Sequence, residues 1–379
     1  MARRTRGTKA RKRVRYAVIG QGYISQVAVL PSFAHARRNS ELAALCSDDP
    51  EKLRKLGRKY SVDQLFGYED FEQGLREGEI DAVYIALPND MHREYTERAA
   101  KVGVHVLCEK PMALSTAECE AMIRATQKAG VRLMIAYRLH FQKANLTAVD
   151  IVKSGWLGQP RFFSSDFSMQ VKDKDNIRLQ KERGGGPLYD LGIYCINAAR
   201  YLFREEPEEV FAASARRKDR RFREVDEMTS AVLRFPGQRL ATFTCSFGAA
   251  DTATYRLVGT EGDLCLDSAY EYAEGMEMTV TVKGKERKQS FPKTDQFASE
   301  LLHFSDCVLS GKEPRPSGRE GMADVRVIQA LLQSARTGKA VSLRSFTPGA
   351  RPEPRQVIRR PAIPKAPALV KATPPSGGR

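Results

Sequence analysis

Lys110 is the first residue whose type and position could do chemistry. It lies in the segment Glu109-Lys110-Pro111, directly after an apolar run that predicts a buried strand. Because proline disfavours helical geometry in the residue before it, Lys110 should stay extended at the end of that strand. Open α/β sheets bind ligands at the carboxyl ends of their strands, so this cation could meet a polar or anionic ligand. An ordinary surface lysine is the alternative.

Asp190 and Tyr194 form a second candidate pair. They follow three glycines at residues 184–186 and are four positions apart in a segment that predicts a helix. Residues four apart lie on one helix face, so this carboxylate and this phenol could act on one ligand. The alternative is structural: Asp190 would compensate the helix dipole and Tyr194 would be a half-buried aromatic residue.

A glycine-rich segment at residues 20–25 follows the apolar run 14–19 and opens a predicted helix. Gly20 allows a tight turn, and Gly22 lets the backbone approach a pyrophosphate at the helix N-terminus. Ser25 stands where a third small residue is usual and still permits close packing. The strand–turn–helix context favours a dinucleotide site over an ordinary glycine-rich turn.

The end of the second predicted strand bears on the choice of dinucleotide. An acidic residue there binds the adenine ribose of NAD and repels the 2′-phosphate of NADP. Ser47 together with Lys52 would hold the phosphate, whereas an inward-pointing Asp48 would favour NAD. We predict NADP, and NAD remains possible.

The first part of the chain must position these residues. It alternates short apolar runs with amphipathic segments, which predicts a parallel, doubly wound Rossmann sheet, an α/β fold, over residues 14–137. The expected strands are residues 14–19, 41–46, 80–87, 105–108 and 132–136. The expected helices are residues 24–38, 51–60, 92–102 and 115–129.

The second part shows strict one-sided alternation, for example at residues 277–283 and 231–235. This pattern is typical of antiparallel strands with one buried face. We therefore predict an α+β domain with a large open, mainly antiparallel sheet over residues 138–346, which would bind substrate and form oligomers. Four helices should cover one face of that sheet, near residues 144–153, 187–203, 296–310 and 320–337.

The net charge of +16 lies mostly at the two ends of the chain. Residues 1–13 hold seven Lys or Arg and no acid, and residues 347–379 hold seven basic residues, eight prolines and the single acid Glu353. We predict a disordered basic arm at 1–13 and a disordered proline-rich tail at 347–379. A nucleic-acid partner is not expected, although such tails could tether a polyanion.

Several other classes of protein are excluded. The seven cysteines are scattered without a Cys-x-x-Cys pair and the five histidines do not join them, so neither a disulfide framework nor a metal site is predicted. No apolar run is long enough to cross a membrane, and the first residues lack the apolar segment of an export signal. We expect a cytoplasmic protein.

The motifs occur in a characteristic order over residues 14–345. In this combination the sequence resembles the glucose–fructose oxidoreductase and inositol dehydrogenase superfamily, above all glucose–fructose oxidoreductase and related aldose oxidoreductases. The matching segments are Gly20-x-Gly22, Leu87-Pro88-Asn89 with His92, Glu109-Lys110-Pro111, Tyr137-Arg138, the three glycines and Asp190-x-x-x-Tyr194.

The resemblance implies a role for each residue that matches a family motif. Catalysis would fall to Lys110, Asp190 and Tyr194. Substrate binding would fall to Lys110, Arg138, His140, Asn145, Asp190 and Tyr194. Cofactor binding would fall to Gly20, Gly22, Tyr23, Ile24, Ser47, Lys52, Leu87, Asn89, His92, Glu109, Lys110, Arg138 and Arg178.

The resemblance also implies an NADP-dependent oxidoreductase that transfers hydride between the nicotinamide and a sugar, either an aldose or a polyol. Lys110 would stabilise the anion of the Tyr194 phenol, which takes the substrate proton, although the proton could pass to Asp190 or Lys110 instead. A homodimer or homotetramer would form through the second-domain sheet. The alternatives are a sugar or inositol/diol dehydrogenase with an exchangeable NAD(P), and a non-catalytic dinucleotide sensor with polyanion-binding tails.

Overall fold

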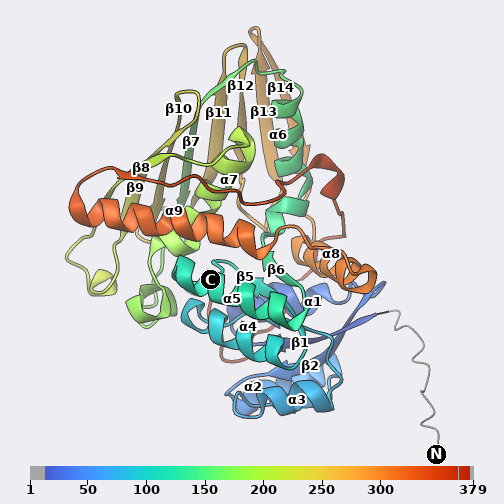
Figure 1. Cartoon of the computed structure of the whole chain (residues 1–379). Coiled ribbons are helices and arrows are strands. Elements are labelled where there is room, and N and C mark those ends of the chain that lie inside the picture. Colours follow the sequence, from blue (N-terminus) through green and yellow to red (C-terminus); the bar gives the residue numbers. More distant parts are fainter. Residues whose placement is uncertain (1–12, 366, 376–379) are drawn as a thin grey trace, which may run out of the picture.

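The computed structural model describes residues 13–365 and 367–375, which form two domains (Figure 1). The first domain contains a parallel sheet in the order β3-β2-β1-β4-β5-β6. This is the doubly wound order predicted from the sequence. Its strands are β1 (Val14–Ile19), β2 (Ser40–Cys46), β3 (Gln64–Phe66), β4 (Ala82–Ile85), β5 (His105–Glu109) and β6 (Leu133–Ala136).

The helices of the first domain begin and end at recognisable signals. The Asp49 side chain accepts hydrogen bonds from the backbone of residues 51 and 52 and so starts α2, while Ser115 caps α5 and the left-handed Gly130 ends it. The expected helix at 24–38 is shorter, a π-helical turn at Ser25–Val29 that continues into α1 (Leu30–Ser32). The other helices are α2 (Pro50–Tyr60), α3 (Phe71–Glu77), α4 (His92–Lys101) and α5 (Thr116–Ala129).

The second domain contains a nine-stranded sheet in the order β14-β13-β12-β11-β7-β10-β9-β8-β15. Only β7 and β10 pair in parallel among the described strands of this sheet; the other neighbours are antiparallel, as predicted. The strands are β7 (Pro160–Ser168), β8 (Glu209–Ala215), β9 (Met228–Phe235), β10 (Arg239–Ser246), β11 (Thr252–Gly259), β12 (Gly262–Asp267), β13 (Met276–Val282), β14 (Lys285–Phe291) and β15 (Val341–Ser342).

Three helices cover one face of this sheet, but the fourth expected helix does not. α6 (Lys143–Lys153), α7 (Ile193–Phe203) and α9 (Gly318–Thr337) lie in front of the strands in Figure 1. α8 (Gln296–Ser310) instead packs on the first domain, where Phe297, Leu301 and Phe304 join a core with Tyr16. The prediction for α8 was wrong because an apolar stripe shows that a helix is buried, not which sheet buries it.

The opposite face of the nine-stranded sheet carries exposed apolar side chains. Phe162 is 47% exposed and Leu240, its partner across β7 and β10, is 44% exposed. Val232 and Phe211, which pair across β9 and β8, are 39% and 41% exposed. An apolar strip therefore crosses four neighbouring strands on the uncovered face.

The tail after residue 346 is not disordered where the structure describes it, which corrects the sequence-based prediction. It returns in an extended path above α9 to α6 and α8 (Figure 1). Ile358 donates its backbone N–H to the Phe141 carbonyl at 3.2 Å, and Glu353 pairs with Arg204 at 2.7 Å. Prolines prevent a helix or strand here, but they do not prevent an extended chain from docking. The predicted arm at 1–13 lies outside the described residues except for residue 13.

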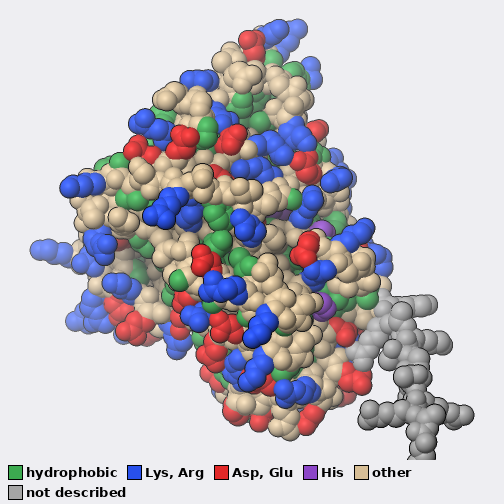
Figure 2. Space-filling view, viewed as in Figure 1, with side chains coloured by type: hydrophobic (Ala, Val, Ile, Leu, Met, Phe, Trp, Pro, Cys, Tyr) green, Lys and Arg blue, Asp and Glu red, His purple; other side chains and the backbone are tan. Residues whose placement is uncertain are grey.

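Two further observations concern the surface. Basic and acidic side chains are interspersed over both domains on the face shown in Figure 2, which agrees with a body of nearly balanced charge. Within residues 13–365 and 367–375, none of the helices is long and apolar enough to cross a membrane.

Candidate active site

Lys110, Asp190 and Tyr194 meet between the two domains, as the sequence predicts. Lys110 follows β5 of the first domain, and its Nζ lies 2.9 Å from Asp190 Oδ1 and 2.9 Å from the Asp190 carbonyl oxygen. The same ammonium lies 4.7 Å from the centre of the Tyr194 ring. Asp190 comes from a π-helical turn, Leu188–Gly192, that leads into α7. An ammonium, a carboxylate and a phenol thus share one site.

Arg178 completes the surroundings of Asp190. Its Nε lies 2.6 Å from Asp190 Oδ2, so the two carboxylate oxygens face two different cations. Burial alone would raise the pKa of Asp190, but Arg178 and Lys110 outweigh that effect and hold the pKa well below its ordinary value. Burial would likewise lower the pKa of Lys110, but Asp190 raises it above its ordinary value. Both groups therefore stay charged near neutral pH.

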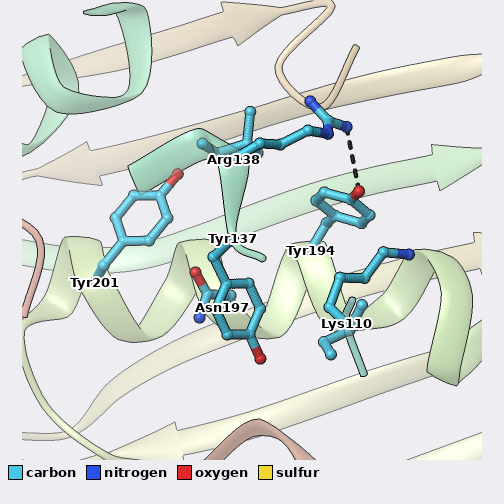
Figure 3. Close-up of a pocket in the computed structure, with 8 residues that line it drawn as sticks. Lys110, Tyr137, Arg138, Tyr194, Asn197 and Tyr201 are labelled. Atoms are coloured by element: carbon cyan, nitrogen blue, oxygen red, sulfur yellow. Dashed lines mark hydrogen bonds between the residues drawn. The ribbon is translucent and has the colours of Figure 1, made fainter. Parts of the chain in front are cut away.

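Arg138 approaches Tyr194 from the other side. It begins the 3-10 turn Arg138–Phe141 after β6, and its guanidinium donates to the Tyr194 hydroxyl at 3.2 Å. The side chain is held by the Tyr270 carbonyl at 2.5 Å and by Gln296. Figure 3 shows Lys110 and Arg138 on opposite sides of the Tyr194 ring. Both cations can stabilise negative charge on the phenol oxygen.

A small pocket opens beside this cluster. Sequence reasoning named three of its lining residues, Lys110, Arg138 and Tyr194, as site residues. Tyr194, Asn197 and Tyr201 lie three and four positions apart on α7, so the helical spacing from Tyr194 could have revealed the other two. The lining residues that were missed are Tyr137, Leu139, Ile193, Asn197 and Tyr201.

His140 and Asn145 are not brought to the pocket. The His140 ring stacks on Tyr137 and bonds to Asn197 Oδ1 at 2.7 Å, while Asn145 Oδ1 accepts from the Tyr201 hydroxyl at 2.8 Å. Both side chains are buried, and their polar atoms are engaged within the second domain. The predicted direct contact of these two residues with substrate is therefore not supported by this geometry; they support the pocket wall from behind.

The glycine-rich turn has the form that a dinucleotide requires. Gly20 has φ +89°, and a Cβ there would meet the Ala86 carbonyl oxygen at 2.6 Å, so only glycine fits. A Cβ on Gly22 would meet nothing within 4 Å, which leaves open space beside this backbone for a pyrophosphate. Ser25 donates to the Gly20 carbonyl at 2.6 Å and fixes the turn.

His92, Asn89 and Leu87 organise the loops next to this turn. The two ring nitrogens of His92 lie 2.8 Å from the Pro111 carbonyl oxygen and 3.0 Å from that of Leu87. Asn89 donates to the Gly184 carbonyl at 2.9 Å. His92 is completely buried, so it ties the loop after β4 to the loop that carries Lys110 and has no face left for a ligand.

Glu109 is held by a hydrogen bond within the first domain. Its Oε1 accepts from the Tyr84 hydroxyl at 2.8 Å, and burial raises the pKa of the Glu109 carboxyl above its ordinary value. One carboxylate oxygen of Glu109 is therefore already engaged, and the cofactor role of this residue stays a prediction. Sequence reasoning missed a buried carboxyl, Glu300 on α8. Burial first, and then the nearby Glu109, raise the pKa of Glu300 well above its ordinary value.

The end of β2 has no inward-pointing acid. Asp48 is exposed, Asp49 caps α2, and the buried Ser47 hydroxyl accepts from the Asp49 N–H at 3.2 Å. Lys52 is half-buried in the first turn of α2. Tyr23 and Ile24, directly after Gly22, are also half-buried at the edge of the cleft.

Comparison with known proteins agrees with this architecture. Residues 14–137 match the oxidoreductase family with an NAD-binding Rossmann fold, and residues 145–265 match the GFO/IDH/MocA C-terminal domain. A D-xylose 1-dehydrogenase (NADP(+)) from Haloferax volcanii is 32% identical over 86% of this chain and 99% of its own. The chain belongs to the GFO/IDH/MocA oxidoreductase family. This confirms the resemblance inferred from the motifs.

Other members of the family are similar over nearly the whole body. The D-xylose 1-dehydrogenase [NADP(+)] of Haloarcula marismortui is 31% identical over 87% of this chain and 93% of its own. Among solved structures, aldose-aldose oxidoreductase from Caulobacter crescentus, complexed with glycerol, is 39% identical with a TM-score of 0.84, covering 87% of this chain and 100% of that chain. A 3-ketoreductase from Actinomadura kijaniata in complex with NADP and TDP-benzene is 26% identical with a TM-score of 0.78, covering 85% and 98%.

Proposed function

We propose that this protein is an NADP-dependent oxidoreductase that transfers hydride between the nicotinamide and a CH–OH carbon of an aldose or polyol. The observation that carries the proposal is the cluster of Lys110, Arg138, Asp190 and Tyr194 at the carboxyl edge of the Rossmann sheet. The similarity to D-xylose dehydrogenases and to an aldose-aldose oxidoreductase supports the substrate class.

Tyr194, in its phenolate form, is the group that takes the substrate proton and becomes the neutral phenol. Asp190 is a weak base because Arg178 and Lys110 lower the pKa of its carboxyl, and Lys110 already carries its proton. Tyr194 lines the pocket, and Arg138 donates to its hydroxyl at 3.2 Å. Sugar oxidation removes this proton from the hydroxyl while the hydride leaves the same carbon; reduction reverses both transfers.

Lys110 and Arg138 supply the positive charge that this step needs. An alkoxide forming beside Tyr194 would lie near both cations, which are held in place before the reaction. Asp190 positions the Lys110 ammonium, and Arg178 positions Asp190 through its other oxygen.

The cofactor would lie along the carboxyl edge of the first domain. Bound NADP would accept or return the hydride. Gly20 and Gly22 would receive its pyrophosphate, and Ser47 with Lys52 would face the adenine ribose.

The test begins with the purified protein. Denaturation followed by identification of any released dinucleotide tells whether the cofactor is retained, and NADPH formation at 340 nm with a panel of aldoses and polyols identifies the substrate. We expect NADP in preference to NAD, and Tyr194→Phe should lower kcat by a factor on the order of 100 or more with little change in NADPH binding. Reduction of neither dinucleotide by any member of the panel would contradict the proposal. A protein that is purified empty but turns over would be a dehydrogenase with an exchangeable cofactor.

We also propose that two copies associate through the uncovered face of the nine-stranded sheet. The support is the apolar strip of Phe162, Leu240, Val232 and Phe211 across four adjacent strands. The mass measured by light scattering should be that of a dimer or tetramer. The double variant Phe162→Arg with Leu240→Glu should shift that mass toward the monomer. A monomeric wild-type protein would refute this proposal.

We propose a cytoplasmic, reducing location. All seven cysteines lie in the described part of the chain and are free thiols, six of them buried. Fractionation of the source cells should recover the protein with the cytosol.

A further inference from the structure

The last described segment of the tail, residues 367–375, lies on the first domain. Ala368 accepts a hydrogen bond from Lys59 Nζ at 3.0 Å, so the tail reaches α2. Further along, the Pro375 carbonyl oxygen accepts from the Lys172 backbone N–H of the second domain at 3.2 Å. The segment therefore crosses from one side of the interdomain cleft to the other, and we call residues 367–375 the strap.

Gln26 holds the strap beside the glycine-rich turn. Its side-chain amide donates to the Val370 carbonyl at 2.9 Å and accepts from the Val370 N–H at 2.7 Å. Gln26 is only 1% exposed and lies in the first helical turn after Gly22. A buried amide that satisfies both backbone groups of one tail residue is a specific docking contact rather than a chance surface encounter.

Lys371 extends from the strap to the end of β2. Its Nζ lies 2.7 Å from Glu51 Oε2 and 3.3 Å from Asp49 Oδ2. Lys371 also has φ +46°, an uncommon conformation for a residue with a side chain, so its surroundings fix its position. Hydrogen bonds from Lys371 and Lys55 lower the pKa of Glu51 to about 2.

The charge at this place bears directly on the choice of dinucleotide. Asp48, Asp49 and Glu51 follow β2, where the adenine ribose lies in Rossmann enzymes, and three acids there would repel a 2′-phosphate. Lys371 compensates two of them. A lysine ammonium has three N–H donors, and the side chain remains 53% exposed, so one donor is available to a phosphate oxygen.

We propose that the strap closes the adenosine end of the dinucleotide cleft and that Lys371 is a specificity-determining residue for the 2′-phosphate of NADP. This inference rests on the proposed function, because it presumes that the cleft binds a dinucleotide. The strap adds to the site a cation that lies more than 300 residues along the chain from the glycine-rich turn and from the end of β2.

The test compares the affinities of full-length variants for NADPH and NADH by fluorescence titration. Lys371→Ala should weaken NADPH binding about tenfold, the effect of one charge-assisted hydrogen bond, and change NADH binding less than about twofold. Lys371→Arg keeps the cation and should retain most of the preference for NADPH. Lys365→Ala, at an exposed lysine of the same tail, is the matched control and should change neither affinity.

A chain that ends at residue 365 tests the strap as a whole. It should bind both dinucleotides more weakly and release them faster, with thermal unfolding of the empty protein measured alongside to show that the body is folded. Tighter binding would overturn the inference, because the strap would then compete with the dinucleotide. Equal weakening of NADPH and NADH by Lys371→Ala would overturn the role in specificity. A wild-type protein that binds neither dinucleotide would instead overturn the proposed function.

Discussion

Two clusters of charged side chains in this protein differ in their balance of charge. The site cluster, defined as Lys110, Arg138, Arg178 and Asp190, contains three cations and one carboxylate. Lys110 and Arg178 pair with Asp190, and Arg138 donates to the Tyr194 hydroxyl. It lies at the interdomain cleft, where the Lys110 and Asp190 side chains are 11% and 21% exposed.

The core cluster is shielded from solvent instead. It is defined as Arg200, Glu206, Glu320, Asp324 and Arg351. Arg200 is fully buried and pairs with Asp324 at 2.5 Å, with Glu206 at 2.8 Å and with Glu320 at 3.0 Å. Arg351 of the tail adds a second cation at 3.1 Å from Glu206. Each carboxylate of the core cluster has a cation partner, so this cluster has no unbalanced positive charge to offer a ligand.

The difference teaches that burial and pairing alone do not mark a catalytic group. Among the described residues, the site cluster combines surplus positive charge with access to a pocket, and only that combination can stabilise an anion formed during a reaction. The core cluster holds α7, α9 and the tail together.

Loss of the Lys110 ammonium should have the largest effect. Lys110→Ala should lower kcat at least about a thousandfold, because one of the two cations beside Tyr194 disappears. Steady-state kinetics measures this, and NADPH titration should show binding within a few-fold of wild type. An equal loss of turnover and of dinucleotide binding would mean that Lys110 is structural.

Loss of Arg200 should affect stability rather than chemistry. Arg200→Met leaves three buried carboxylates without their shared cation and should cost about 3 kcal/mol or more in the free energy of unfolding. Urea denaturation measures the loss, and the exposed Arg336→Met serves as the control. If the folded variant lost kcat while its stability was unchanged, the distinction between the two clusters would fail.

Asp190→Asn should have an intermediate effect. Lys110 keeps the Asp190 carbonyl as an acceptor but loses the charged oxygen that positions it, so kcat should fall about tenfold to a hundredfold while the KM for the sugar changes less. A fall as large as that of Lys110→Ala would indicate that Asp190 itself takes the proton.

The smallest effect concerns the pH dependence of stability next to the core cluster. Burial lowers the pKa of His140, whereas an unfolded histidine binds a proton below about pH 6.5. The unfolded state therefore binds more protons, and stability is lost as the pH falls below that value, by up to about 1.4 kcal/mol per pH unit for this residue. His140→Gln should flatten the slope in urea titrations between pH 7 and 5.5. An unchanged slope would show that His140 does not contribute.

Much of this organisation could be predicted from local pattern. The apolar run 14–19 coincides with β1, and the motif residues Lys110, Asp190 and Tyr194 do meet. β3 was missed because three residues are too few to show a period. The pairing of Arg178 with Asp190 across the glycine loop could not be predicted, since the partner of a charged side chain depends on how the loop folds back.

The tail also shows that the partners of a segment cannot be predicted from its own sequence. Its proline-rich, basic composition predicts an extended chain, and the chain is extended. Composition carries no information about the groups on the body that receive it, such as Gln26 and Phe141, so docking and disorder could not be distinguished.

The placement of α8 has a consequence for how the molecule can be divided. The polypeptide leaves the Rossmann half after β6, builds nearly the whole nine-stranded sheet, and then comes back to supply Phe297, Leu301 and Phe304 to the first half. A fragment cut out at residues 14–137 would bare the surface around Tyr16 and Val18 to water. The two halves are thus interleaved along the chain. A chimera that exchanges the Rossmann half between relatives must exchange α8 with it.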